Sequence, residues 1–396
     1  MGSSLLSTLL MLLVGALLAR LTAHRLRRWA VPAIVLELLM GVALGNTVLP
    51  FARIEALSGL TGLGVLALFF QVGMSVRDDL RGSRPAAVLR TVLLSALTPL
   101  LAWWPLQQGF GLPVAATVVC LAVLSATGTG VTLRALAQAG ALGSPSGRLL
   151  VGVSVLDDLP AIGLLTLAMV LGQRPGAGAG LTGMALGLAG GLTLVPLSLV
   201  GCRWWLRRHG PWQPGPLGVL LLLIISSWLG EITGLTSLLG ALWGGVLLNR
   251  LAPMAPDSPE HRALEDQLAL LSEVFLPLYF IGVGMRIEAA TLLRPEAWWL
   301  ALALTLMAIA AKLLCGLGIS AGDQRAGVDR WVVVTGLIPR GLPGLVFAST
   351  ALAAGVISQA QFSALVLMVS TTTVLGLLLL GQRLAKLAEG AAALRP

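Results

Sequence analysis

Two adjacent carboxylates interrupt a long apolar stretch of the chain. Asp157 and Asp158 lie in the segment SVLDDLPAIG, whose other side chains are mostly apolar. An ionised carboxylate at the centre of a membrane costs roughly 2.5–3.5 kcal/mol even on lenient scales, and intramembrane acids commonly mark ion or proton pathways. Neighbours on a helix point about 100° apart, so one aspartate can pair with a cation while the other lines a cavity.

Two basic residues, Lys312 and Arg340, also lie deep in apolar stretches. We expect Lys312 to pair with one aspartate and so offset the cost of burying both charges. The other carboxylate could then hold either a proton or a hydrated cation, with Thr127 and freed backbone carbonyls as further oxygen ligands. For Arg340 two roles stay open: neutralising the carbonyls at the end of a half-helix, or binding an acid on a neighbouring helix. Intramembrane charges can also serve only to fix helix packing.

The composition is that of a polytopic membrane protein. Of 396 residues, 57% are hydrophobic and 11% charged, and the mean hydropathy is +0.92. The net charge of +9 comes from basic residues scattered between apolar segments, so we expect no nucleic-acid partner. The three cysteines lack metal-ligand spacing. No nucleophile and base set or phosphate loop stands out, so we predict neither an enzyme nor a cofactor.

Apolar runs long enough to cross about 30 Å of hydrocarbon predict an all-α protein with about thirteen transmembrane helices. They cover residues 4–21, 32–49, 58–76, 87–107, 112–139, 147–172, 178–202, 216–230, 234–250, 266–285, 296–318, 330–353 and 362–382. Of the 26 Lys and Arg residues, 20 fall at connections after odd-numbered spans or in the C-terminal tail, and only four fall at connections after even-numbered spans. Because cytoplasmic loops collect basic residues, this predicts an external N-terminus and a cytoplasmic C-terminus.

Two of these spans contain helix-breaking residues. They are Gly128 and Gly130 in SATGTGV, and Pro339, Gly341 and Pro343 in IPRGLPGL. Proline interrupts a helix, and unpaired backbone at membrane depth is tolerated only beside protein or a water-filled cavity. The breaks lie seven spans apart, so their helices run in opposite directions, as in inverted-topology repeats that frame an ion site. The alternative is that Gly and Pro are simply common in membrane helices.

Seven segments in this order resemble the monovalent cation:proton antiporter-2 family, and within it sodium/proton antiporters with paired aspartates. They are VPAIVLELLMGVALG, GLGVLALFFQVGMSV, SATGTGVTLRALAQAG, GRLLVGVSVLDDLPAIGLL, GLTSLLGALWGGVLL, LPLYFIGVGMRI and LIPRGLPGLVFASTALAAGVIS. The resemblance implies thirteen helices, a homodimer, and a core domain that moves like an elevator. It implies that Asp158 binds the ion and the proton, that Asp157 pairs with Lys312, and that Thr127 lies where two broken helices cross.

The resemblance also assigns parts of the chain to domains. Residues 1–86 and 216–290 are expected on the dimer side, 87–172 and 291–396 in the core with a short cytoplasmic tail, and 173–215 as a linker helix. Two departures stand out. Many relatives read PRGE where this chain has Leu342 after Gly341. Many potassium-efflux relatives carry a C-terminal regulatory domain, and gating by a nucleotide is not expected within this chain.

The predicted function is therefore a secondary antiporter in a bacterial inner membrane, exchanging cytoplasmic sodium or lithium for external protons. Two titratable acids suggest electrogenic exchange, with two protons per cation. The expected partners are monovalent cations, protons, lipid and a second copy of the chain. Potassium/proton exchange is the closest alternative, and a transport-inactive membrane sensor is another.

Overall fold

The computed structural model describes residues 2–25, 32–49, 51, 54, 57–79, 85–172, 181–213, 215–233, 237–253 and 258–393. Within these ranges every regular element is a helix and no strand occurs. Among the described residues, seven helices are long and apolar enough to cross a membrane, and four shorter apolar helices accompany them. The prediction of an all-α, polytopic membrane protein is confirmed at this level.

The helices follow the predicted spans closely. The first part of the chain forms α1 (Gly2–Arg25), α2 (Ala33–Thr47), α3 (Ser58–Asp79), α4 (Pro85–Leu97), α5 (Val114–Ser125), α6 (Thr129–Gln138) and α7 (Pro145–Gly172). The middle forms α8 (Leu181–His209), α9 (Pro216–Ile232), α10 (Ser237–Leu251) and α11 (Pro259–Met285). The last part forms α12 (Ala289–Leu292), α13 (Pro295–Cys315), α14 (Ala321–Arg325), α15 (Arg330–Leu337), α16 (Gly341–Ala353) and α17 (Gln359–Ala393).

Every predicted span contains at least one helix, but some spans are divided. The fourth continues beyond α4 as a 3-10 turn, Thr98–Ala102, and a π-helical turn, Pro105–Gly109. Each of these turns has a proline in its first two positions, where the missing N–H prevents regular α-helical bonding. The number of helices that cross the membrane remains a prediction.

The chain divides into two compact units. The first contains residues 1–53, 79–169 and 280–396, and the second contains 54–78 and 170–279. Every predicted site residue lies in the first unit. Residues 1–53 also belong to the first unit, although the sequence assigns them to the dimer side. The division of the chain into a dimer side and a core domain stays a prediction.

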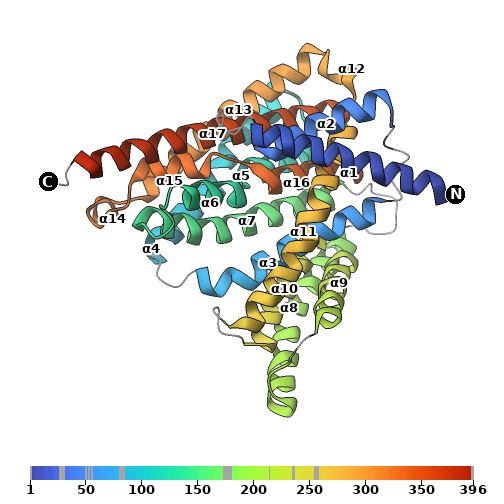
Figure 1. Ribbon diagram of the computed structural model, residues 1–396, viewed down its shortest axis with the longest axis vertical. Coiled ribbons are helices and arrows are strands. Elements are labelled where there is room, and N and C mark those ends of the chain that lie inside the picture. Colours follow the sequence, from blue (N-terminus) through green and yellow to red (C-terminus); the bar gives the residue numbers. More distant parts are fainter. Residues whose placement is uncertain are drawn as a thin grey trace. The chain divides into compact units, whose positions relative to one another are not determined.

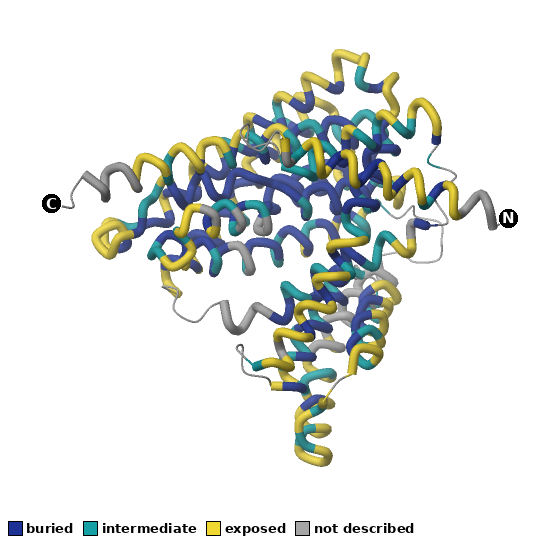
Figure 2. Tube along the Cα trace, viewed as in Figure 1, coloured by how far each residue is buried: buried dark blue, intermediate teal, exposed yellow. Residues whose placement is uncertain are grey.

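Within the first unit, α17 packs along α13 and along both α15 and α16, while α16 also packs on α5 (Figure 1). The segment from α15 through α16 is almost wholly buried (Figure 2). A cluster of apolar side chains joins α4, α7, α15 and α17 and includes Val88, Leu150 and Leu337. This packing fixes the helices that carry the charged side chains relative to one another.

The second unit is held together by apolar packing and by polar contacts. In it α10 packs against α9 and α8. The Asn249 side chain of α10 donates to the Met74 carbonyl of α3 at 2.6 Å, and the Trp243 indole donates to the Ser198 hydroxyl of α8 at 3.0 Å. Such side-chain bonds join helices for which apolar burial alone gives little driving force in lipid.

Candidate functional site

The two predicted helix breaks meet each other. The first covers residues 126–128, between α5 and α6, and the second covers 338–340, between α15 and α16. The Gly128 N–H donates to the Pro339 carbonyl at 2.6 Å. A Cβ on Gly128 would lie 2.9 Å from the Gly341 nitrogen, and Gly341 itself has a φ of +48°. Glycine is therefore required where the two backbones touch.

Two of the residues expected to break the helices do not do so. Gly130 lies inside α6, and Pro343 lies in the first turn of α16. Proline is tolerated there because the first N–H groups of a helix have no partner within it. Pro339 lies in the break itself, one residue before Arg340. Assigning Gly130 and Pro343 to the breaks was therefore wrong.

The paired carboxylates lie on α7, which continues as one helix through its internal proline. Asp157 and Asp158 are 0% and 3% exposed. Asp157 Oδ2 accepts hydrogen bonds from the Thr127 hydroxyl and from Lys312 Nζ, the latter at 2.9 Å. Asp158 receives a hydrogen bond from the Thr127 backbone N–H. The Oδ1 atom of each aspartate has no hydrogen-bond partner, so each carboxylate keeps one oxygen for a proton or a cation.

Lys312, on α13, is completely buried and surrounded by oxygen atoms. Besides Asp157, its ammonium contacts the Ser95 hydroxyl, the Ser125 carbonyl at 3.0 Å and the Thr127 hydroxyl at 3.0 Å. The structure therefore brings Lys312 and Asp157 together as the sequence suggested. The sequence did not single out the contacts with Ser95 and Ser125, because a backbone carbonyl such as that of Ser125 occurs at every residue and the hydroxyl of Ser95 lies in an ordinary apolar helix.

Arg340 bonds only to backbone carbonyls among the contacts of the described residues. Its guanidinium donates to the Leu124 and Ala126 carbonyls, the latter at 2.8 Å, and to the Ala308 carbonyl at 2.9 Å. Leu124 lies in the last turn of α5 and Ala126 is its C-cap residue, so the first of the two roles left open for Arg340 is the one seen. The carbonyls freed by the first break thus face basic side chains, which makes them poorer cation ligands than the sequence suggested.

The ends of three helices of this unit are joined by Asp329, which precedes α15. Its carboxylate caps α15 through the Val332 N–H at 2.9 Å and accepts from Arg383 of α17 at 2.5 and 3.2 Å. Its own N–H donates to the Ser146 hydroxyl of α7 at 2.7 Å. Burial alone would raise the pKa of Asp329, but the bonds from Arg383 and Val332 hold that pKa below its ordinary value.

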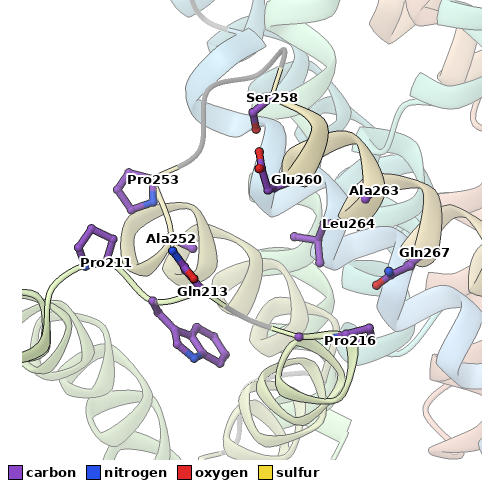
Figure 3. A pocket seen from close by; sticks show the side chains of 12 residues that line it. Pro211, Gln213, Pro216, Ala252, Pro253, Ser258, Glu260, Ala263, Leu264 and Gln267 are labelled. Carbon is purple, nitrogen blue, oxygen red and sulfur yellow. The ribbon is translucent and has the colours of Figure 1, made fainter.

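The second unit contains a separate hollow of about 680 Å³ (Figure 3). Its lining comes from the connection between α8 and α9, from the residues that follow α10 and from the first turns of α11, and it includes Trp212, Gln213, Glu260 and Gln267. Among the described residues that line it, Glu260 is the one that carries a charge. The described lining of this hollow thus has neither the paired acids nor the buried base of the site in the first unit.

Comparison with known proteins gives one family for nearly the whole chain. The family described as sodium/hydrogen exchanger, transmembrane, matches residues 10–381. The chain is 28% identical to the high-affinity Na(+)/H(+) antiporter NhaS3 of Synechocystis sp., over 86% of this chain and 75% of that protein. It is 24% identical to the Na(+)/H(+)-K(+) antiporter GerN of Bacillus cereus, over 87% of this chain and 88% of that protein. It is 23% identical to a Na(+)/H(+) antiporter of Enterococcus hirae, over 90% of this chain and 93% of that protein.

Proposed function

The chain belongs to the sodium/hydrogen exchanger family, and we propose that it exchanges cytoplasmic sodium or lithium ions for external protons across a bacterial inner membrane. The observation that carries this proposal is the buried pair Asp157 and Asp158 beside the meeting point of two helix breaks. The relatives that are named Na(+)/H(+) antiporters support the proposal of cation/proton exchange.

Asp158 is the proposed carrier of the cation and of the proton. It makes no ion pair among the described residues, and its Oδ1 has no partner. A carboxylate that holds a sodium ion loses its proton, and one that is protonated loses most of its affinity for sodium. Asp157 remains with Lys312 for most of the cycle, and the Thr127 hydroxyl and backbone orient both acids. Competition between two ligands for one carboxylate is sufficient for exchange.

The proposed exchange is electrogenic, with two protons moved for each cation, because two acids are buried at one site. Moving one net charge is worth about 2.3 kcal/mol for each 100 mV of membrane potential. The membrane potential would then drive sodium export.

The proposed architecture has thirteen transmembrane helices in inverted repeats, with the N-terminus outside and the C-terminus in the cytoplasm. The meeting of the two breaks and the distribution of basic residues both support it. We further propose a homodimer in which residues 1–86 and 216–290 form the dimer side. Residues 87–172 and 291–396 form the core that moves like an elevator, and 173–215 link the two.

The decisive experiment measures proton flux in proteoliposomes with a pH-sensitive dye, comparing sodium, lithium and potassium. Asp158→Asn should abolish cation-dependent proton flux, because the amide can no longer exchange a proton. The matched control is Glu296→Gln, which neutralises an exposed acid at the start of α13 and should leave the flux unchanged. Unchanged flux in Asp158→Asn contradicts the assignment, and a reversal potential for one-to-one exchange contradicts electrogenic transport.

Two alternatives give different results in the same assay. Potassium/proton exchange has support in the printed name of GerN, which includes potassium, and it predicts flux driven by potassium rather than by sodium. A transport-inactive sensor predicts no flux from the unmodified protein with any of the three cations, at any pH.

A further inference from the structure

The Lys312 ammonium bridges α4 to the first helix break and to α7. Its partner on α4 is Ser95, a completely buried residue whose hydroxyl accepts one of the ammonium hydrogens. The other acceptors are the Ser125 carbonyl and the Thr127 hydroxyl at the break and the Asp157 carboxylate on α7. Four oxygen atoms therefore surround one nitrogen.

The Lys312 ammonium has one more oxygen acceptor around it than it has hydrogens to donate. An ammonium has three N–H groups and cannot use more than three strong acceptors at once. If Asp157 leaves, the Ser95, Ser125 and Thr127 oxygens can still pair all three hydrogens. If Ser95 is also absent, one buried N–H is left unpaired, which carries the full desolvation penalty of that group.

The hydroxyl of Ser95 makes a different contact from those of Thr91 in α4 and of Thr98, the first residue of the 3-10 turn that follows α4. Thr91 and Thr98 lie about one turn before and after Ser95, on the same face of the segment. Each of these threonines donates to a carbonyl one turn earlier in its own segment, at 2.8 Å in both cases. The Thr98 hydroxyl also lies 3.8 Å from Cys315 Sγ of α13, but only the Ser95 hydroxyl among these three accepts from the Lys312 ammonium in the described contacts, so its role is tied to Lys312.

We propose that Ser95 is a positioning residue that keeps the Lys312 ammonium fully hydrogen-bonded whenever Asp157 turns toward the transported cation or proton. This inference rests on the proposed antiport function. A cation arriving between the two aspartates repels the ammonium and competes with it for Asp157. The free Oδ1 atoms of Asp157 and Asp158 are the oxygens such a cation would meet. With Ser95 present, the ion pair of Lys312 can open without leaving a donor unpaired.

The first test is independent of transport and measures melting of the purified protein in detergent. Ser95→Ala alone should change the melting temperature little, because three acceptors remain for three hydrogens. In an Asp157→Ala background the same substitution should lower it by roughly 1–4 °C more, because one N–H then lacks an acceptor. Ser95→Thr, which keeps the hydroxyl, should restore the value. Strictly additive shifts overturn the proposal.

The second test measures cation-dependent proton flux in proteoliposomes containing the single variants. Ser95→Ala should raise the KM for the cation by roughly five- to a hundredfold while the maximal rate changes less than about twofold, since the unpaired donor arises on cation binding. Ser95→Thr should rescue the KM. Thr91→Val removes a neighbouring buried hydroxyl that does not touch Lys312 and should leave the KM unchanged.

The outcomes separate the two proposals. An unchanged KM in Ser95→Ala overturns the role of Ser95 while leaving antiport intact. Absence of flux from the unmodified protein refutes the antiport function, and the melting experiment still decides whether Ser95 is the reserve acceptor for Lys312.

Discussion

Removing the buried ammonium should destabilise the protein far more than removing an exposed one. In Lys312→Met an unbranched apolar side chain one atom shorter replaces the lysine, and Asp157 loses its partner at 2.9 Å in a position that is 0% exposed. Breaking a buried ion pair by removing one member typically costs about 3–5 kcal/mol. With about 2.1 cal/mol/K of unfolding entropy per residue, a chain of 396 residues should melt roughly 4–6 °C lower.

Intrinsic tryptophan fluorescence during heating in detergent measures this shift. Lys386→Met is the matched control, since Lys386 lies exposed on α17 and the same substitution there should change the melting temperature by less than about 1 °C. The double variant with Asp157→Asn should recover most of the loss, because no unpaired charge then remains. A Lys312→Met protein as stable as the control, or a double variant no better than the single one, would refute the reasoning.

Two further predictions concern the elements that hold the site. Asp329→Asn should lower stability by about 1 kcal/mol at neutral pH through loss of the ion pair with Arg383, since asparagine can still cap α15. The pKa of Asp329 is lowered in the folded protein, so its contribution to stability is present above the ordinary aspartate pKa and is lost as the pH falls through the folded pKa. The melting temperatures of the variant and the parent should therefore converge at acidic pH. A difference that stays constant down to acidic pH contradicts this prediction. Gly128→Ala should abolish cation-dependent proton flux, because the added Cβ would collide with the backbone of the second break. The control Gly163→Ala has open space around the added methyl group and should retain the flux of the parent. Equal flux in both variants would show that the breaks need not touch.

The charged members of the site could be predicted from the sequence because their cost in lipid makes them stand out. Asp157, Asp158, Lys312 and Arg340 are among the charges that interrupt apolar runs, and the structure buries all four in one unit. The oxygens that satisfy the two bases could not be predicted in the same way. Backbone carbonyls occur at every residue, and a hydroxyl such as that of Ser95 is common in membrane helices.

The positions of the breaks were predictable only to within a few residues. Pro339 and Pro343 have the same intrinsic effect on a helix, and only the point at which α16 begins decides which of them interrupts it. Once Gly341 adopts a positive φ and begins the new helix, Pro343 falls in a first turn that accepts it. The grouping of residues 54–78 with 170–279 was also beyond the sequence, since hydropathy locates spans without saying which of them pack together.

The arrangement of the four buried charges explains why Asp158 is the member best suited to change its charge. Arg340 bonds only to carbonyls among the described residues and keeps its charge throughout, while Lys312 and Asp157 neutralise each other. With Asp158 ionised, the four charges sum to zero. When Asp158 takes up a cation, the site carries one excess positive charge, supplied by Arg340, and under the proposed two-proton exchange the protonation of both aspartates leaves an excess of two positive charges. That excess opposes tight retention of either ligand, so under the proposed mechanism Arg340 favours the release that a carrier needs on the opposite side of the membrane.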